Sequence, residues 1–124
     1  MHKKLLSFLT VALLLPCGLF STTSGAKAQN AYPGMAPLEQ YLIPDQNAEI
    51  ALARSAAPKS IADAAEVLVL GRNGYTTAVK GSNGFVCMVQ RGWSGSTDFS
   101  DFWNPKQRAP ICFNAPAAKS YGAL

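Results

Sequence analysis

Cys87 and Cys112 are the residues of this chain with the clearest capacity for chemistry. As a thiolate, Cys87 could act as a nucleophile, and the two cysteines together could form a disulfide. A nucleophilic cysteine usually relies on a histidine base, and the one histidine, His2, lies at the extreme N-terminus. Two cysteines in an exported chain favour a disulfide. We predict a Cys87–Cys112 disulfide and keep a thiol-dependent enzyme using Cys87 as an alternative.

Three oxygen-bearing side chains, Asp98, Asp101 and Asn104, recur at every third position in the C-terminal part of the chain. A calcium loop of the EF-hand type requires alternating acidic residues, a glycine and a distant glutamate. The present pattern lacks that spacing, and these side chains suit turns and helix caps. We therefore predict no metal site and no cofactor.

Three aromatic residues, Tyr75, Trp93 and Trp103, are the candidate ligand-binding residues. Exposed aromatic side chains mark interaction sites, and these three could form a carbohydrate- or peptide-binding surface. In so small a domain, the same side chains also serve as core residues. We identify no catalytic residues, and the sequence favours a protein without catalytic activity while leaving that question open.

The N-terminal 28 residues have the three-part pattern of a secretory signal peptide. Residues 2–4 are basic or imidazole-bearing, residues 5–15 are apolar but too short to span a bilayer, and Ala26-Lys27-Ala28 is a small-x-small cleavage site. We expect cleavage near Ala28 and export to the periplasm or the cell exterior. We do not expect a lipoprotein at Cys17, because a lipidation site needs a small residue directly before the cysteine and Pro16 occupies that position.

Cleavage at this point would change the charge of the chain. The whole sequence has 11 Lys and Arg against 7 Asp and Glu, but Lys3, Lys4 and Lys27 would leave with the signal peptide. The eight remaining basic residues form no patch of the kind that binds nucleic acid. We expect neither a nucleic-acid partner nor a transmembrane segment in the mature chain, and an extracytoplasmic protein or glycan is the partner class that fits such a chain.

Three short β-rich runs, at residues 67–70, 75–79 and 85–89, form the centre of the predicted fold. Asn73-Gly74 between the first two runs predicts a hairpin in which Arg72 pairs with Tyr75. The second connection is either two residues, Asn83-Gly84, or the five residues 80–84. That choice decides which face of the sheet carries Cys87, and it stays open.

A helix is predicted at residues 45–57, with Asp45 as its N-cap and Pro58 beyond its end. The resulting fold class is α+β, with one N-terminal helix packed on a small antiparallel β-meander and a disulfide-stapled, irregular C-terminal loop. A short extra strand is expected around Cys112. The predicted organisation is a signal peptide at residues 1–28, a Pro-containing lead-in at 29–44, an α+β domain at 45–114 and a C-terminal tail at 115–124.

Residues 50–114 contain the segments IALARSAAP, EVLVLGRNGYTTAVKGSNGFVCMVQRGW and DFWNPKQRAPICFN. In these segments the chain resembles a family of uncharacterised secreted bacterial proteins. The resemblance covers about half of the chain and implies export, but it implies no activity. The sequence most favours a small non-catalytic binding or structural module. The resemblance also implies a further alternative, a fragment of a longer secreted domain, because the members of that family continue beyond the point where this chain ends. Missing cover would then explain why the first β-rich run is apolar on both faces.

Overall fold

The computed structural model describes residue 18 and residues 30–121. Of the predicted signal peptide, the structure describes residue 18 alone. Cys17 and the predicted cleavage site therefore lie outside the described residues. In the described part, no helix has both the length and the hydropathy required to cross a membrane. The elements follow in chain order: η1 (Leu38–Gln40), α1 (Gln46–Arg54), α2 (Lys59–Ala62), β1 (Glu66–Gly71), β2 (Gly74–Val79), β3 (Val86–Gln90), η2 (Gly92–Ser94), β4 (Ala109–Phe113) and α3 (Ala115–Tyr121).

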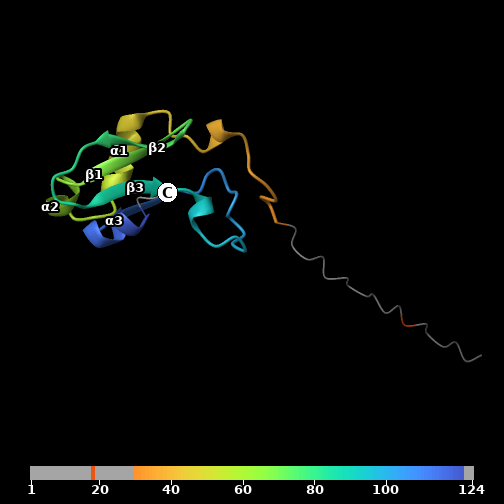
Figure 1. Cartoon of the computed structure of the whole chain (residues 1–124). Helices are drawn as coiled ribbons and strands as arrows, with labels where there is room; N and C mark the ends of the chain where they lie inside the picture. Colours follow the sequence, from red (N-terminus) through yellow and green to blue (C-terminus); the bar gives the residue numbers. More distant parts are fainter. Residues whose placement is uncertain (1–17, 19–29, 122–124) are drawn as a thin grey trace, which may run out of the picture.

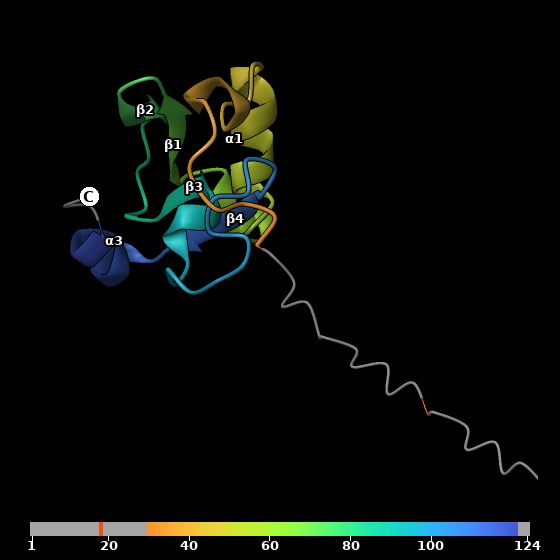
Figure 2. The ribbon, with the colours of Figure 1, turned by 90° about the vertical axis from the view of Figure 1, so that its right-hand side faces the viewer.

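The fold is α+β, as the sequence predicted. Four strands form one mixed sheet in the order β2-β1-β3-β4, and α1 lies across one face of it (Figures 1 and 2). The strand segment expected around Cys112 is β4, an edge strand antiparallel to β3. In Figure 2, α1 and α3 lie on opposite sides of the sheet.

The three central strands do not form the predicted antiparallel meander. β3 pairs with β1 rather than with β2, and the two strands run parallel. The connection after β2 must therefore pass the start of β1, and Gly81 lies where it does so. A Cβ atom on Gly81 would be only 2.1 Å from the backbone nitrogen of Glu66. The missing side chain allows this close crossing, and Ser82 then donates its N–H to the carbonyl of Ala64 (2.8 Å).

The first hairpin forms with a register two residues away from the predicted one. Leu70 is opposite Tyr75 and Gly71 is opposite Gly74, so the turn residues are Arg72 and Asn73. Gly74 has φ 106°, whereas no non-glycine residue in the described part of the chain has a positive φ. The glycine therefore follows the two central turn residues, as in hairpins built on a type I turn, instead of being one of them.

Helix α1 begins where the sequence predicted, because the Asp45 carboxylate accepts the N–H of Asn47 (2.9 Å). Its last helical residue is Arg54, three residues before the predicted end. Between helix and sheet lies a small apolar core, made of the buried residues Ala53, Ala65, Val67, Cys87 and Val89. Cys87 thus lies on the sheet face that α1 covers, which settles the question left open by the second connection.

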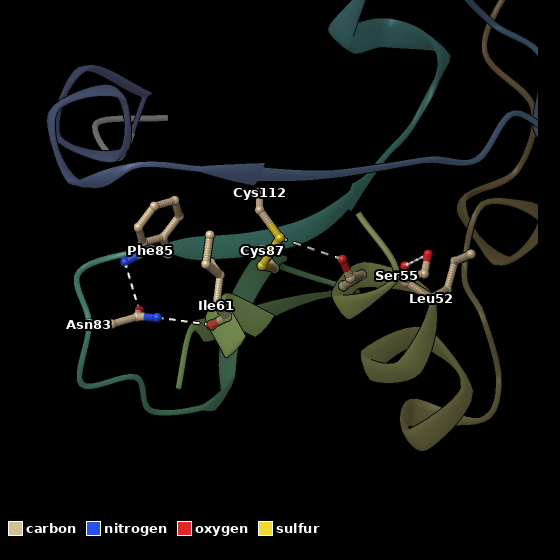
Figure 3. Close-up of a disulfide and its surroundings, with 8 residues drawn as sticks. Leu52, Ser55, Ile61, Asn83, Phe85, Cys87 and Cys112 are labelled. Atoms are coloured by element: carbon tan, nitrogen blue, oxygen red, sulfur yellow. Dashed lines mark hydrogen bonds between the residues drawn. A yellow bond between two sulfur atoms is a disulfide. The ribbon is translucent and has the colours of Figure 1, made fainter. Parts of the chain in front are cut away.

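The disulfide joins Cys87 and Cys112, which are directly opposite each other on β3 and β4 (Figure 3). In the same view, Asn83 fixes the chain just before β3. Its side chain donates to the carbonyl of Ile61 (2.9 Å) and accepts the N–H of Phe85 (3.0 Å). The disulfide therefore links the edge strand β4 covalently to the central strand β3, beside the apolar core.

The segment predicted as a C-terminal tail contains helix α3. Asn114 caps its start, since its side-chain oxygen accepts the N–H of Ala117 (3.0 Å). Alanine at the following positions is a strong helix former. Pro116 is tolerated because it lies in the first turn, where backbone N–H groups have no helical partner.

Candidate functional site

The irregular segment of residues 92–108, here called the C-terminal loop, leaves the sheet at the end of β3 and returns at the start of β4. Its base is closed by the last ladder pair, Gln90 opposite Ala109. The segment contains a single turn of 3-10 helix and no strand. Its conformation must therefore be determined by side-chain contacts and turns. Tyr41 makes two of these contacts, and Arg91 binds the carbonyl of Tyr41.

The Arg91 side chain is buried at the base of the C-terminal loop, with 2% of its surface exposed. Its Nε donates to the carbonyl of Tyr41 (2.8 Å), one terminal nitrogen donates to the carbonyl of Val89, and the other forms an ion pair with Glu49 (3.0 Å). The guanidinium thereby joins the lead-in segment, strand β3 and helix α1. A buried charge must be paired and hydrogen-bonded to be tolerated, and Arg91 is both.

Glu49 is the counter-ion, and its residue is 1% exposed on the sheet-facing side of α1. Besides Arg91, its Oε1 accepts the backbone N–H of Leu70 (3.2 Å). The sequence pattern indicates this pair, although our sequence-based prediction did not include it. Glu49 precedes the buried Ala53 by four positions, and so shares its helix face. Arg91 continues the alternation of Cys87 and Val89, which places it on the same sheet face.

Tyr41 links the lead-in segment to both tryptophans of the C-terminal loop. Its ring packs against that of Trp93, with the centroids 4.6 Å apart. Its hydroxyl donates to the carbonyl of Trp103 (2.8 Å) and accepts the N–H of Ala36 (3.0 Å). Tyr41 itself is fully buried, so it serves as a central support for the loop.

Tyr75, the third candidate aromatic residue, reaches the same region from β2. Its hydroxyl donates to the carbonyl of Val89 (2.7 Å), the same oxygen that accepts from Arg91. Burial raises the pKa of the Tyr75 phenol above its usual value. Burial, together with the positive charge of Arg91, lowers the pKa of Arg108 nearby.

The structure thus connects Tyr75, Trp93 and Trp103 through Arg91 and Tyr41. All three are partly buried, and the contacts described above are with other parts of the same chain. Trp103 also packs edge-on against Phe102, with ring centroids 4.7 Å apart. Trp93 and Trp103 thus fix the loop through contacts inside the molecule, and Tyr75 reaches the same region from β2.

Asp98, Asp101 and Asn104 form turns within the C-terminal loop. The Ser96 hydroxyl donates to Asp98, the Asn104 side chain donates to Asp101 (3.2 Å), and Asn104 in turn accepts the N–H of Lys106 (2.9 Å). The residues that the structure describes include no cluster of three or more metal-ligating side chains. These turns fold the loop back on itself.

Phe99 is the aromatic residue that the loop presents to solvent, and it is 45% exposed. Phe99 lines a depression of about 170 Å³ between the end of β3 and the start of β4. The polar side chains of this depression come from Gln90, Ser94 and Gln107, with Arg91 beneath.

A shallower surface continues from the depression along residues 95–100, where Phe99 is flanked by Ser96, Asp98 and Ser100. The depression and this surface share Gly95 and Phe99. We call them together the Phe99 surface. Besides Ala109 and the buried Arg91, its side chains are amides, hydroxyls, one carboxylate and one aromatic ring, a set that can bind a ligand by hydrogen bonds and apolar contact. The sulfur of Cys87 is bonded to Cys112 and is not available as a thiolate.

Comparison with known proteins gives no match: no family model, curated protein or solved structure is similar to this chain at a significant level. A function for this chain must therefore be argued from its own residues.

Proposed function

We propose that this protein is a small exported binding module without catalytic activity, and that its C-terminal loop is the binding element. Export is supported by the signal-peptide pattern of the first 28 residues and by the Cys87–Cys112 disulfide. Disulfides persist in oxidising compartments and are rare in the cytosol of most organisms. A binding role is supported by the way in which the loop is held.

The observation that carries the proposal is the buried Arg91 side chain at the base of the loop. Burying an ion pair costs desolvation free energy, and an apolar pair of similar volume is often as stable or more stable. The Arg91–Glu49 pair contributes something that apolar residues could not, namely three directed hydrogen bonds that hold the lead-in, β3 and α1 together at the base of the loop. A loop ordered in advance loses less conformational entropy on binding.

The structural-module alternative predicts the same fold but no ligand. The exposed Phe99 ring favours a binding role, because a structural role alone does not require a large aromatic side chain to face solvent beside polar groups. The alternative surface of Tyr75, Trp93 and Trp103 is less favoured as a direct contact surface, because the contacts of these residues are with other parts of the same chain.

Two arrays test the proposal with the disulfide-bonded protein from residue 29 onward. One displays oligosaccharides of cell envelopes and extracellular polymers, and the other displays peptides. We expect binding on one of them, weakened by Tyr41→Phe, which removes the hydroxyl that bonds Trp103. Tyr32→Phe is the matched control, because no hydrogen bond to the Tyr32 hydroxyl occurs within the described residues.

Absence of loop-dependent binding on both arrays would overturn the proposal. So would turnover of esterase, glycosidase, protease or phosphatase substrates that co-purifies with the protein and is lost on mutation of the loop. Mass spectrometry of the exported protein provides a separate check on localisation. It should show a mature chain that begins at Gln29, and retention of residues 5–15 would contradict the export assignment.

A further inference from the structure

The Phe99 surface has the composition of a site for one class of ligand. We propose that it binds a neutral saccharide, with one sugar ring in the depression that Phe99 lines and the rest of the glycan along residues 95–100. This inference rests on the proposed binding function and names the ligand class. Three features of the surface support this proposal: the amide side chains of Gln90 and Gln107, the exposed ring of Phe99 and the charge of the lining residues.

The depression lies where strands β3 and β4 separate. Gln90 and Ala109 form the last pair of the ladder, and beyond them the chain turns away into η2 on one side and into Gln107 on the other. Two glutamines therefore line the opening: Gln90 is the last residue of β3, and Gln107 lies just before the start of β4. The volume of about 170 Å³ is smaller than that of a typical drug site, and suits one sugar ring at a time.

The amide groups of Gln90 and Gln107 are free to bind a ligand. Both residues are partly exposed, and within the described residues neither side-chain amide makes a hydrogen bond. A primary amide offers two donors and one acceptor oxygen. Neighbouring hydroxyls of a sugar ring present the complementary donors and acceptors. Ser94 and Ser96 add hydroxyl groups at the same edge.

Phe99 supplies the apolar part of the recognition. A pyranose ring has one face of C–H groups, and such a face packs against an aromatic ring while the equatorial hydroxyls point outward to polar side chains. At 45% exposure, the Phe99 ring offers such a contact without any rearrangement of the core. Binding would remove apolar surface from water, which is favourable in proportion to the area covered.

The charges of the surface argue against an ionic ligand. Arg91 lies under the depression, but it is 2% exposed and its hydrogen bonds are directed to Glu49, Tyr41 and Val89. Asp98 is the charged side chain on the outer part of the surface, and it accepts from the Ser96 hydroxyl. A phosphate or sulfate would meet this carboxylate without an exposed cation in the lining, whereas a neutral sugar has no such conflict.

NMR titration of the isotope-labelled protein tests the inference directly. The probes are soluble neutral oligosaccharides, namely cello-, chito- and malto-oligosaccharides, together with heparin-derived anionic oligosaccharides and a mixed peptide pool. We expect at least one neutral series to shift the amide signals of Gln90, Phe99 and Gln107 at low-millimolar concentration. The anionic sugars should not shift these signals.

Two variants and one control make the test specific. Phe99→Ala should weaken saccharide binding at least about tenfold, as expected for a central aromatic contact, and Gln107→Ala should weaken it by a smaller factor. Met35→Ala, which removes another exposed apolar side chain (54% exposed) outside this surface, should leave binding unchanged. All three positions are partly or largely exposed, so the variants should fold.

The outcomes separate this inference from the proposed function. Peptide binding without saccharide binding would overturn the saccharide assignment and leave the binding module intact. Saccharide binding that is unaffected by Phe99→Ala would also overturn it, because the ligand would then lie elsewhere. No loop-dependent binding of either class would overturn both proposals.

Discussion

The helix-and-sheet half of this protein and its C-terminal loop are ordered by different interactions. In the first, α1 covers a sheet face whose buried residues are almost all apolar. In the second, residues 92–108 contain no strand and are held by Tyr41, which Arg91 anchors, and by turns of Asp and Asn side chains. The first half depends on burial of apolar area, which tolerates small changes of shape. The second depends on a few directed bonds, and each of them is hard to replace.

Arg91 lies at the junction of the two regions, so its replacement should have the largest effect. Arg91→Met would leave the Glu49 carboxylate buried without its cation and would remove the hydrogen bonds from Arg91 to the carbonyls of Tyr41 and Val89. Breaking one partner of a buried pair costs about 3–5 kcal/mol. We expect a loss of that order in the free energy of unfolding, measured by urea denaturation.

Two further variants sharpen this result. Glu49→Leu combined with Arg91→Met should recover much of the lost stability, since the double variant leaves no unpaired charge. Lys59→Ala breaks an exposed pair with Asp63, and it should change stability by less than about 1 kcal/mol. An Arg91→Met protein as stable as the wild type would show that the buried pair does not connect the two regions.

Removal of the disulfide should have the next largest effect. Cys87 and Cys112 are separated by 25 positions, and the chain-entropy model gives roughly 3.5 kcal/mol for a loop of that length. A Cys87→Ser, Cys112→Ser variant should lose stability of this order in denaturant titration. Peptide mapping without reductant should find the two cysteines joined in the wild type. Free thiols in freshly exported protein would contradict the account and restore Cys87 as a candidate nucleophile.

Tyr41→Phe should distinguish the two regions most clearly. The variant keeps the ring that packs on Trp93 but removes the hydroxyl that bonds Trp103 and Ala36. The cost should be about 1–3 kcal/mol, the range for leaving a buried hydrogen-bonding group unpaired. Hydrogen exchange should accelerate in the C-terminal loop and not in β1 or β3. Equal acceleration in both regions would mean that they unfold as one unit.

The smallest predicted effect is a pH dependence at alkaline pH. Burial raises the pKa of Tyr75 above its usual value of 10.0. The folded state therefore holds this proton more tightly than the unfolded chain does, so the contribution to stability is complete below pH 10 and is lost as the pH rises through the folded-state pKa. Unfolding free energies measured from pH 8 to 11 should fall less steeply in Tyr75→Phe. Identical slopes would show that the phenol is not protected by burial.

The sequence predicted the apolar half of the fold better than it predicted the polar half. Local signals identified α1, because its cap and composition act within a few residues, and they identified the cysteine pair. The order of the strands depended on a long-range event, the passage of Gly81 beside the start of β1. A glycine in a polar turn segment carries no sign of what lies next to it, so the antiparallel meander was the natural but wrong expectation.

The candidate site shows the same limit. Tyr75, Trp93 and Trp103 were selected for their residue type, and the structure connects them, but through contacts inside the molecule. Phe99, which was not among these candidates, faces solvent. The exposure of an aromatic side chain in an irregular loop depends on the turns around it, here those of Asp98 and Asn104. Those turns produce no periodic pattern of apolar residues, so the exposure of Phe99 could not be predicted from the sequence.

The central claim is that the C-terminal loop is as well ordered as the sheet, and backbone ¹⁵N relaxation tests it most directly. Rigid backbone gives order parameters of about 0.85, and flexible segments fall below about 0.6. We predict values near the upper figure for residues 92–108 in the wild type, matching β1 and β3, and lower values in the same segment of Tyr41→Phe. Wild-type values below about 0.6 across this loop would contradict the account.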